Sequence, residues 1–192
     1  MPDTGGVRRA IPLLLTAVLA SACTGNVGAG DPSRYTGSES QAGEVYPEAD
    51  RDPAPAISGT TLDGQSLNVS DLTGKVVVIN FWASWCGPCR GEARNLNEVY
   101  AQTKASGVEF VGIDMKDIKT NAKAFQANKS VKYPSLYDDD GSLLLKFRGQ
   151  APQTPPATIV LDRKGRVAAR FPGPVTTSML LAPVQVIAKE AG

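Results

Sequence analysis

Two cysteines separated by two residues are the part of this 192-residue chain best suited to chemistry. Cys86 and Cys89 stand in the run Trp85-Cys86-Gly87-Pro88-Cys89. Two thiols at this spacing can close into a disulfide and open again by thiol–disulfide exchange. A loop this short restricts the unfolded chain very little, so a purely structural disulfide here would stabilise the fold weakly. The spacing therefore predicts a redox-active pair.

A metal site is the main alternative for these two thiols. Zinc would need two more ligands from Cys or His, and the chain contains no His and only one other cysteine, Cys23. The absence of His also excludes a Ser-His or Cys-His nucleophile pair and any His-bound metal. We therefore expect no metal and no cofactor. A non-catalytic module that uses the thiols to hold a partner or Cu(I) stays open at this point.

The residues around the pair predict a strand followed by a helix. Residues 75–80 contain a β-branched apolar run that is typical of a buried strand. After the pair, apolar residues recur at spacings of three and four, which indicates a helix with one apolar face: Ala93, Leu96, Val99 and Tyr100. A thiol in the first turn of a helix faces free N–H groups that favour the thiolate. Cys86 is the expected nucleophile, and Cys89 is placed to resolve a mixed disulfide formed on it.

Residues 81–89, Phe-Trp-Ala-Ser-Trp-Cys-Gly-Pro-Cys, resemble the active-site segment of the thioredoxin superfamily. Two details are closer to its TlpA/ResA-like extracytoplasmic group. Asn80 stands where thioredoxin carries a buried acid, and Glu92 matches an acidic residue found in that group. The resemblance covers residues 53–192. It implies an α/β thioredoxin-like fold, with a central mixed β-sheet flanked by helices on both faces.

Glu92 follows Cys89 by three residues, so the two side chains share a helix face. Its candidate role is to modulate the pKa of Cys89 or to relay its proton. The alternative is a solvated first-turn glutamate that suits the helix dipole. Pro88 has no N–H to lose in this turn and stiffens it.

A proline pair marks a second informative stretch, because it leads into an apolar strand over residues 157–162. In thioredoxin-like folds a cis-proline begins the strand that faces the cysteines, and Pro156 matches it. The preceding residue usually offers its backbone to an extended substrate. Pro155 has no N–H, so it can accept a hydrogen bond there but cannot donate one. The resemblance implies substrate contacts at Trp85, Pro88, Pro155 and Pro156; a simple proline-rich turn is the alternative for the pair.

Residues 1–22 predict a signal peptide. Arg8 and Arg9 precede an apolar run over 10–20 that is too short for a lasting transmembrane helix. Residues 19–23, Leu-Ala-Ser-Ala-Cys, then resemble a bacterial lipobox. This implies that Cys23 is lipidated and anchors the protein at the extracytoplasmic face of the cell membrane. Ordinary signal cleavage before Cys23 is the alternative.

Composition divides the remainder into a flexible linker over residues 23–52 and one compact domain over 53–192. The linker is rich in Gly, Ser, Pro, Asp and Glu and has hardly an apolar residue. The whole chain is 42% hydrophobic and 20% charged, with a net charge of +1. These values are ordinary for a globular protein and give no sign of nucleic-acid binding. We expect a monomer.

Further elements are predicted inside the domain. They are a hairpin over 60–67, a strand over 108–114, a helix over 120–129 capped by Thr120 or Asn121, a hairpin joining 157–162 to 167–171, and a closing helix over 176–189 that Pro183 breaks early. Asp138, Asp139 and Asp140 predict a solvated turn rather than a calcium site, because the downstream glutamate of an EF-hand is missing.

These features predict a membrane-tethered thiol–disulfide oxidoreductase that reduces protein disulfides outside the cytoplasm. The resemblance implies a place in cytochrome c maturation, where relatives reduce apocytochrome c, and electrons from a membrane protein of the CcdA type. Because the cell exterior is oxidising, a reductase there must draw its electrons from the cytoplasm. A disulfide oxidase or isomerase is the alternative within this chemistry, and a non-catalytic binding or chaperone module is the alternative outside it.

Overall fold

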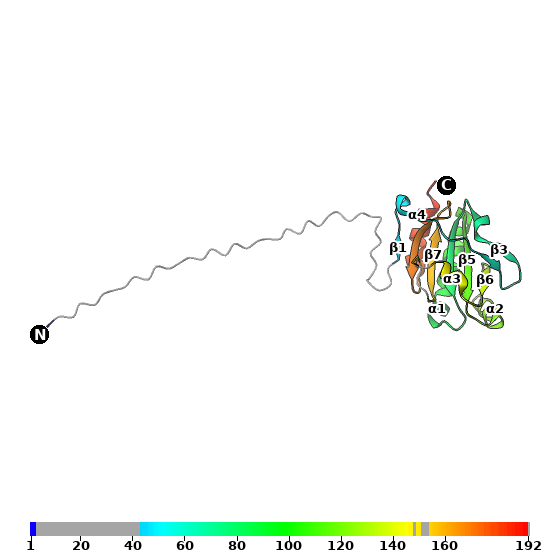
Figure 1. Ribbon diagram of the computed structural model, residues 1–192, viewed down its shortest axis with the longest axis horizontal. Coiled ribbons are helices and arrows are strands. Elements are labelled where there is room, and N and C mark those ends of the chain that lie inside the picture. Colours follow the sequence, from blue (N-terminus) through cyan, green and yellow to red (C-terminus); the bar gives the residue numbers. More distant parts are fainter. Residues whose placement is uncertain (3–42, 148, 151–153, 192) are drawn as a thin grey trace. The chain divides into compact units, whose positions relative to one another are not determined.

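The computed structural model of the protein describes residues 1–2, 43–147, 149–150 and 154–191 (Figure 1). Apart from its first two residues, the expected signal peptide lies outside the described residues, as do Cys23 and most of the expected linker. All helices and strands described below belong to the unit from Asp31 to Gly192. Within the described ranges, no helix combines the length and apolar character that a membrane span requires.

A six-stranded mixed sheet forms the centre of this unit. Its strands lie side by side in the order β1 (Glu44–Val45), β8 (Val167–Pro172), β7 (Ala157–Leu161), β4 (Val76–Trp82), β5 (Val108–Met115) and β6 (Ser135–Asp138). Strands β4, β5 and β6 run parallel, and the other neighbours pair antiparallel. A separate hairpin pairs β2 (Ser58–Thr60) with β3 (Ser66–Asn68), as expected from the Asp-Gly turn between them.

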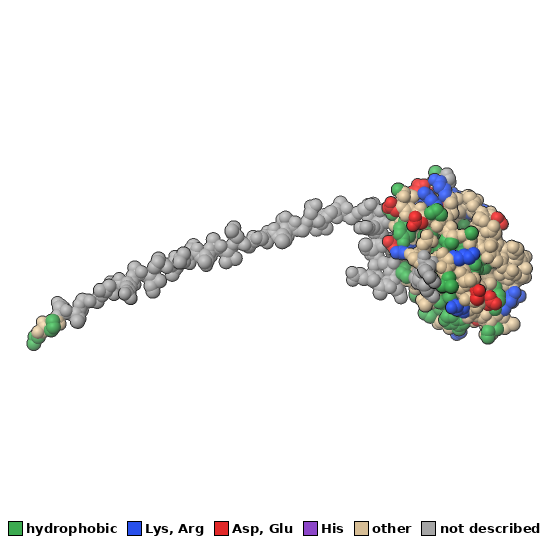
Figure 2. Space-filling view, viewed as in Figure 1, with side chains coloured by type: hydrophobic (Ala, Val, Ile, Leu, Met, Phe, Trp, Pro, Cys, Tyr) green, Lys and Arg blue, Asp and Glu red, His purple; other side chains and the backbone are tan. Residues whose placement is uncertain are grey.

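Helices cover both faces of the sheet, which confirms the expected fold class. They are α1 (Gly87–Thr103), α2 (Lys119–Asn128), α3 (Ser142–Lys146) and α4 (Thr177–Ala188), with short 3-10 turns at Glu48–Asp50, Val69–Leu72 and Lys104–Ser106. Apolar residues of α1 and α4 share one buried cluster with the strands, and those of α3 share another. Charged side chains of both signs lie among polar and apolar ones on the surface seen in Figure 2.

Strand β4 is buried along its whole length, because it lies between these two clusters. Val76 and Val78 point into the cluster shared with α1, whereas Ile79 and Phe81 point into the cluster shared with α3. This is the alternation expected of a strand that has helices on both sides. The loop that follows β4 therefore starts from a strand that is buried at every residue.

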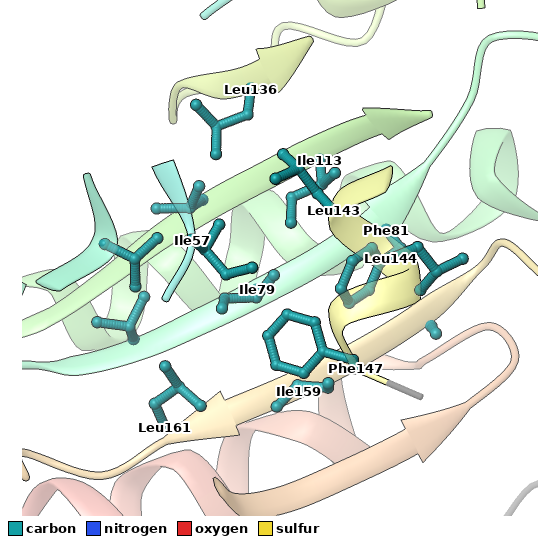
Figure 3. Packing of buried hydrophobic residues seen from close by; sticks show 14 of the residues in the cluster. Ile57, Ile79, Phe81, Ile113, Leu136, Leu143, Leu144, Phe147, Ile159 and Leu161 are labelled. Carbon is teal, nitrogen blue, oxygen red and sulfur yellow. The ribbon is translucent and has the colours of Figure 1, made fainter. Parts of the chain in front are cut away.

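The α3 side of the core is shown in Figure 3. Leu143, Leu144 and Phe147 belong to the same buried cluster as Ile79 and Ile159 of the sheet, and Figure 3 shows Phe147 between these two isoleucines. The rings of Phe81 and Phe147 meet edge to face, with centroids 5.4 Å apart. Burying each such side chain contributes roughly 1.5–3 kcal/mol. The short helix α3, which the sequence analysis did not predict, thus closes one face of the core.

The boundary expected at residue 53 needs correction, because residues 44–52 belong to the fold. Strand β1 pairs with β8. The Arg51 side chain is buried, and its guanidinium pairs with the carboxylates of Asp162, at 3.3 Å, and Glu190. Strand pairing, ion pairs and the partly buried Val45 and Tyr46 hold this segment, whereas its polar composition made it look like linker.

Two helix predictions also need correction. Helix α2 begins at Lys119 after the N-cap residue Ile118, whose side chain makes no capping bond, so neither Thr120 nor Asn121 is the cap. Helix α4 continues through Pro183 to Ala188. Pro183 is itself buried there with other apolar residues of the helix, and this packing outweighs the hydrogen bond that a proline cannot donate.

The predicted solvated turn at residues 138–140 holds only in part. Asp139 and Asp140 are exposed, but Asp138 is buried and accepts hydrogen bonds from the backbone N–H of Leu143 and the hydroxyl of Ser142. Asp138 therefore fixes the start of α3. Within the described part of the chain, no group of three or more acidic or cysteine side chains could hold a metal ion.

Candidate active site

Cys86 and Cys89 form a disulfide at the N-terminus of α1, with their Cα atoms 5.3 Å apart. Cys86 is the N-cap of the helix, and its Sγ accepts a hydrogen bond of 3.2 Å from the backbone N–H of Cys89. Both residues are buried, Cys89 slightly more than Cys86. Backbone N–H groups and the positive end of a helix favour the thiolate of a cap cysteine once the disulfide opens.

The loop that carries Cys86 is fixed by hydrogen bonds to its own backbone carbonyls. Strand β4 ends at Trp82, and the N–H of Cys86 donates to the carbonyl of Ala83, which closes a tight turn. The guanidinium of Arg90, one turn into α1, donates to the carbonyl of Ser84 through Nε at 3.0 Å and Nη2 at 2.8 Å. These hydrogen bonds therefore fix the cysteines between the end of β4 and the start of α1.

Glu92 lies buried on α1, three residues after Cys89, and its relative exposure is only 2%. Its Oε1 accepts a hydrogen bond of 2.9 Å from Nδ2 of Asn80, and its Oε2 accepts one of 2.9 Å from the N–H of Val175. The same amide of Asn80 reaches the hydroxyl of Thr158 on β7 at 3.2 Å. The prediction that Glu92 shares the buried side of the helix with Cys89 is confirmed, and the solvated alternative is wrong.

Burial raises the pKa of Glu92 to about 7, and the hydrogen bonds from Val175 and Asn80 counteract part of that rise. A carboxyl with a pKa near neutrality can both take up and release a proton under ordinary conditions. The structure therefore places, three residues after Cys89 on α1, a buried carboxyl that can exchange a proton near neutral pH.

The peptide bond between Pro155 and Pro156 is cis, as the sequence analysis expected. Pro156 is buried, and Pro155 is half-buried. Strand β7 follows directly, and its first residue, Ala157, pairs with Phe81 of β4. The proline pair therefore lies next to the end of β4, on the edge of the sheet from which the Cys86 loop leaves.

The remaining residues expected to contact substrate differ in their surroundings. Trp85 is 55% exposed, and its indole N–H donates to the carbonyl of Lys116 at 3.0 Å. Pro88 is exposed in the first turn of α1. Ile118, in the loop after β5, is also exposed. Two exposed apolar side chains, Trp85 and Pro88, thus flank Cys86 in the sequence.

Sequence reasoning missed the support that the loop after β5 gives to the active-site loop. The carboxylate of Asp117 accepts hydrogen bonds from the N–H of Ser84 and, at 2.9 Å, from its hydroxyl. It also accepts one from the N–H of Ile118. A signal was present, because the carboxyl ends of parallel strands meet at one edge of a sheet. Polar residues that follow the strand predicted over 108–114 could therefore have been expected to lie beside the active-site loop.

Comparison with known proteins agrees with this geometry. Residues 49–184 match the Redoxin family. The chain is 32% identical over 127 residues to the thiol-disulfide oxidoreductase ResA of Bacillus thuringiensis subsp. konkukian, covering 66% of this chain and 72% of that protein. It is 36% identical over 129 residues to the thiol:disulfide interchange protein HelX of Rhodobacter capsulatus, covering 66% of this chain and 70% of that protein.

A solved structure gives the same result. A secreted thiol-disulfide isomerase from Corynebacterium glutamicum superposes with a TM-score of 0.74 at 31% sequence identity, over 82% of this chain and 98% of that one. These matches favour an oxidoreductase over a non-catalytic binding module. With its disulfide at the head of α1 and a cis-proline beside it, the chain belongs to the Redoxin family as a TlpA/ResA-like thiol–disulfide oxidoreductase of the thioredoxin superfamily.

Proposed function

We propose that the protein reduces disulfides of other proteins outside the cytoplasm, with Cys86 as the attacking thiol and Cys89 as the resolving thiol. The observation that carries the proposal is the position of Cys86 as N-cap of α1, where its Sγ accepts the N–H of Cys89. That environment stabilises a thiolate on Cys86 in preference to one on Cys89.

The proposed reaction moves two electrons from the enzyme to the substrate. The thiolate of Cys86 attacks one sulfur of a substrate disulfide, which forms a mixed disulfide and releases the first substrate thiolate. Cys89 then gives up its proton and attacks Sγ of Cys86. The Cys86–Cys89 disulfide forms, the mixed disulfide breaks, and the second substrate sulfur leaves as a thiolate. Each released thiolate takes up a proton.

Glu92 is the proposed acceptor for the proton of Cys89. It lies three residues further along the same helix and is buried as deeply as that thiol. Its pKa of about 7 allows it to be ionised before the step and protonated after it. Trp85, Pro88, Pro155 and Pro156 are the proposed contacts for the substrate, because the first two are exposed beside Cys86 and the proline pair adjoins the end of β4.

The proposed location is the extracytoplasmic face of the cell membrane, with a lipid anchor on Cys23. The apolar run and lipobox-like residues 19–23 support it, together with the secreted relative from Corynebacterium glutamicum. Fractionation of cells that express Cys23→Ala tests the anchor. The variant should leave the membrane fraction, and a variant that is membrane-bound and processed like the parent would contradict the anchor.

The proposed substrates are apocytochromes c, whose cysteines must be reduced before haem attachment, and the proposed electron donor is a membrane protein of the CcdA type. This rests on the resemblance to the TlpA/ResA-like group. A strain without the gene should lose cytochromes with covalently bound haem and regain them when dithiothreitol is added. Normal cytochrome levels in that strain would contradict this substrate class.

Disulfide isomerisation is the second candidate, because the structural relative from Corynebacterium glutamicum is described as a thiol-disulfide isomerase. An isomerase would restore activity to ribonuclease that contains scrambled disulfides without a net supply of electrons. Under the same conditions a reductase in catalytic amount would leave the ribonuclease scrambled and inactive, because each reduced enzyme molecule supplies two electrons only once.

Two cysteine variants test the chemistry itself. Cys86→Ser should abolish the reduction of insulin, because the attacking thiolate is lost. Cys89→Ser should still attack and should accumulate mixed disulfides with cell-envelope proteins, because nothing resolves them. Insulin reduction by Cys86→Ser at the parent rate would overturn the assignment of the nucleophile.

A further inference from the structure

Asp114 is a buried carboxyl that the proposed reaction does not use. It lies in β5, between Trp82 of β4 and Tyr137 of β6, and its relative exposure is 0%. Neither of its oxygens has a donor within hydrogen-bond distance among the described residues. An ionised carboxylate without donors is strongly disfavoured in such a site, whereas a protonated carboxyl is tolerated and needs an acceptor.

The charge and the hydrogen-bonding capacity of the Asp117 carboxylate both raise the pKa of Asp114, so this carboxylate is the candidate acceptor for the Asp114 proton. Two carboxylates are both acceptors, so a hydrogen bond between them exists only when one carries a proton. Asp117 already accepts the N–H and hydroxyl of Ser84 and the N–H of Ile118, so its oxygens already have donors. Asp114 has no such donors, so the shared proton resides on Asp114.

The charges around Asp114 strengthen this assignment. Burial, Asp117 and Asp138 of β6 together raise the pKa of Asp114 to about 8. From α2, Lys119 lies over the ring of Tyr137, 5.5 Å from its centroid, and the Tyr137 hydroxyl donates to the carbonyl of Asp117. From α1, only the disulfide of Cys86 and Cys89 enters the buried cluster that contains Trp82. No ion pair joins Asp114 to a cation among the described residues.

Asp117 connects this carboxyl to the active site. It holds Ser84, which lies two residues before Cys86, and the neighbouring carbonyl of Lys116 holds the indole of Trp85. The loop after β5 thus supports both residues that precede the attacking thiol, and Asp114 lies in β5 three residues before Asp117.

We propose that Asp114 is a positioning residue whose protonated carboxyl donates a hydrogen bond to Asp117 and thereby holds the Ser84–Trp85 segment in the orientation that presents Cys86 to substrate. When Asp114 loses its proton, two carboxylates face each other, and Asp117 moves away from Ser84. The inference deepens the function proposed above and rests on Cys86 as the attacking thiol.

The first test is the pH dependence of a single turnover of the pre-reduced full chain with insulin, from pH 6.5 to 10. The parent rate should fall above pH 8, approaching about tenfold for each further pH unit, as expected for one essential acid. Asp114→Asn supplies a permanent amide donor to Asp117 and should keep its rate at pH 10. Asp114→Ala supplies none and should be slow at every pH. The exposed residue Asp139 gives the matched control, and Asp139→Asn should follow the parent.

A second measurement follows the protonation of Asp114 and the environment of Ser84 and Trp85 without relying on activity. In nuclear magnetic resonance spectra of the full chain, the carboxyl carbon signal that disappears in Asp114→Asn should titrate above pH 7. The amide signals of Ser84 and Trp85 should shift over the same pH range in the parent and stay constant in Asp114→Asn. If Asp114 titrates below pH 5, or if the amides shift equally in both proteins, the inference is overturned.

The two tests separate the inference from the proposed function. A parent that never reduces insulin but shows the coupled titration of Asp114 and Ser84 would refute the reductase and support the positioning role of Asp114. A parent that reduces insulin with the same alkaline fall as Asp114→Asn would support the reductase and refute the role of Asp114.

Discussion

The two buried carboxyls near the cysteines, Glu92 on α1 and Asp114 on β5, are held in opposite ways. Glu92 receives two hydrogen bonds, from Asn80 and Val175. Asp114 receives none from the described residues and faces other acids instead. Burial is the largest cause of the raised pKa in both cases. Their different partners therefore decide what each carboxyl can do.

This difference separates two uses of a buried acid. Donors stabilise the ionised form of Glu92 enough that it can exchange a proton near neutral pH, which suits a step that removes the proton of Cys89. Asp114 lacks donors and keeps its proton to a higher pH, which suits a hydrogen bond to its neighbour Asp117. In the two roles that we propose, Glu92 exchanges its proton with Cys89, and Asp114 retains its proton to hold a loop.

The largest effect we expect is on stability in Asp114→Asn. An acid whose pKa is raised on folding stabilises the native state fully only below its unfolded pKa, about 3.9, and this contribution is lost as the pH rises to the folded pKa, about 8. At about 1.36 kcal/mol per pKa unit, the loss reaches at most roughly 6 kcal/mol. The amide carries no charge, so the variant should be more stable than the parent at pH 9, by several kcal/mol.

Urea unfolding at pH 9, 7 and 4, with the disulfide intact, measures the difference in the free energy of unfolding between Asp114→Asn and the parent. It should narrow as the pH falls and be small at pH 4, where Asp114 is protonated in the folded protein. A variant that is less stable than the parent at pH 9 would break the comparison, because it would mean that the Asp114 carboxylate has a stabilising partner.

The next effect is on release of the mixed disulfide in Glu92→Gln. Glutamine fills the same space but cannot accept the proton of Cys89, so the resolving step should slow about 10- to 100-fold near pH 7. Attack by Cys86 should be unchanged. Rapid acid quenching of a single turnover separates the two steps.

Glu98→Gln is the matched control for this variant. Glu98 lies on the same helix, but its carboxylate bonds to Arg94 and Thr177, away from the cysteines. If Glu92→Gln and the parent resolve the mixed disulfide at equal rates, Glu92 has only a structural role. Glu92 and Asp114 would then not differ in function as proposed.

The smallest effect is expected for Ser84→Ala. The change removes the hydroxyl that donates to Asp117 at 2.9 Å but leaves the backbone N–H that donates to the same carboxylate. The free energy of unfolding should fall by about 1 kcal/mol. The alkaline fall in rate should remain, because Asp114 and Asp117 are unchanged. Complete loss of insulin reduction in Ser84→Ala would mean that the hydroxyl itself takes part in the reaction.

Local patterns were sufficient to predict the elements that carry the cysteines. The β-branched run of β4 and the apolar spacing of α1 are signals within short windows, and the cysteines lie between them. The proline pair was found in the same way. Short sequence windows were therefore enough to place Cys86 and Cys89 at the start of a helix, Glu92 on the same helix, and a cis-proline at Pro156.

Features that depend on distant residues could not be predicted. Strand β1 is held by pairing with β8, and Arg51 by partners more than a hundred residues away in sequence. Glu92 looked equally suited to solvent until the N–H of Val175 supplied its second donor. The link from Asp117 to the active site could not be predicted either, because it depends on Ser84, which lies in the loop after a different strand.

The reduction potential of the Cys86–Cys89 pair tests the central claim most directly. It should be measured on the chain carrying Cys23→Ala, so that only these two thiols exchange with glutathione and dithiothreitol buffers. The account predicts a value near that of thioredoxin, about −270 mV, which lets the pair reduce protein disulfides. A value near that of DsbA, about −120 mV, would contradict it and make the protein an oxidant.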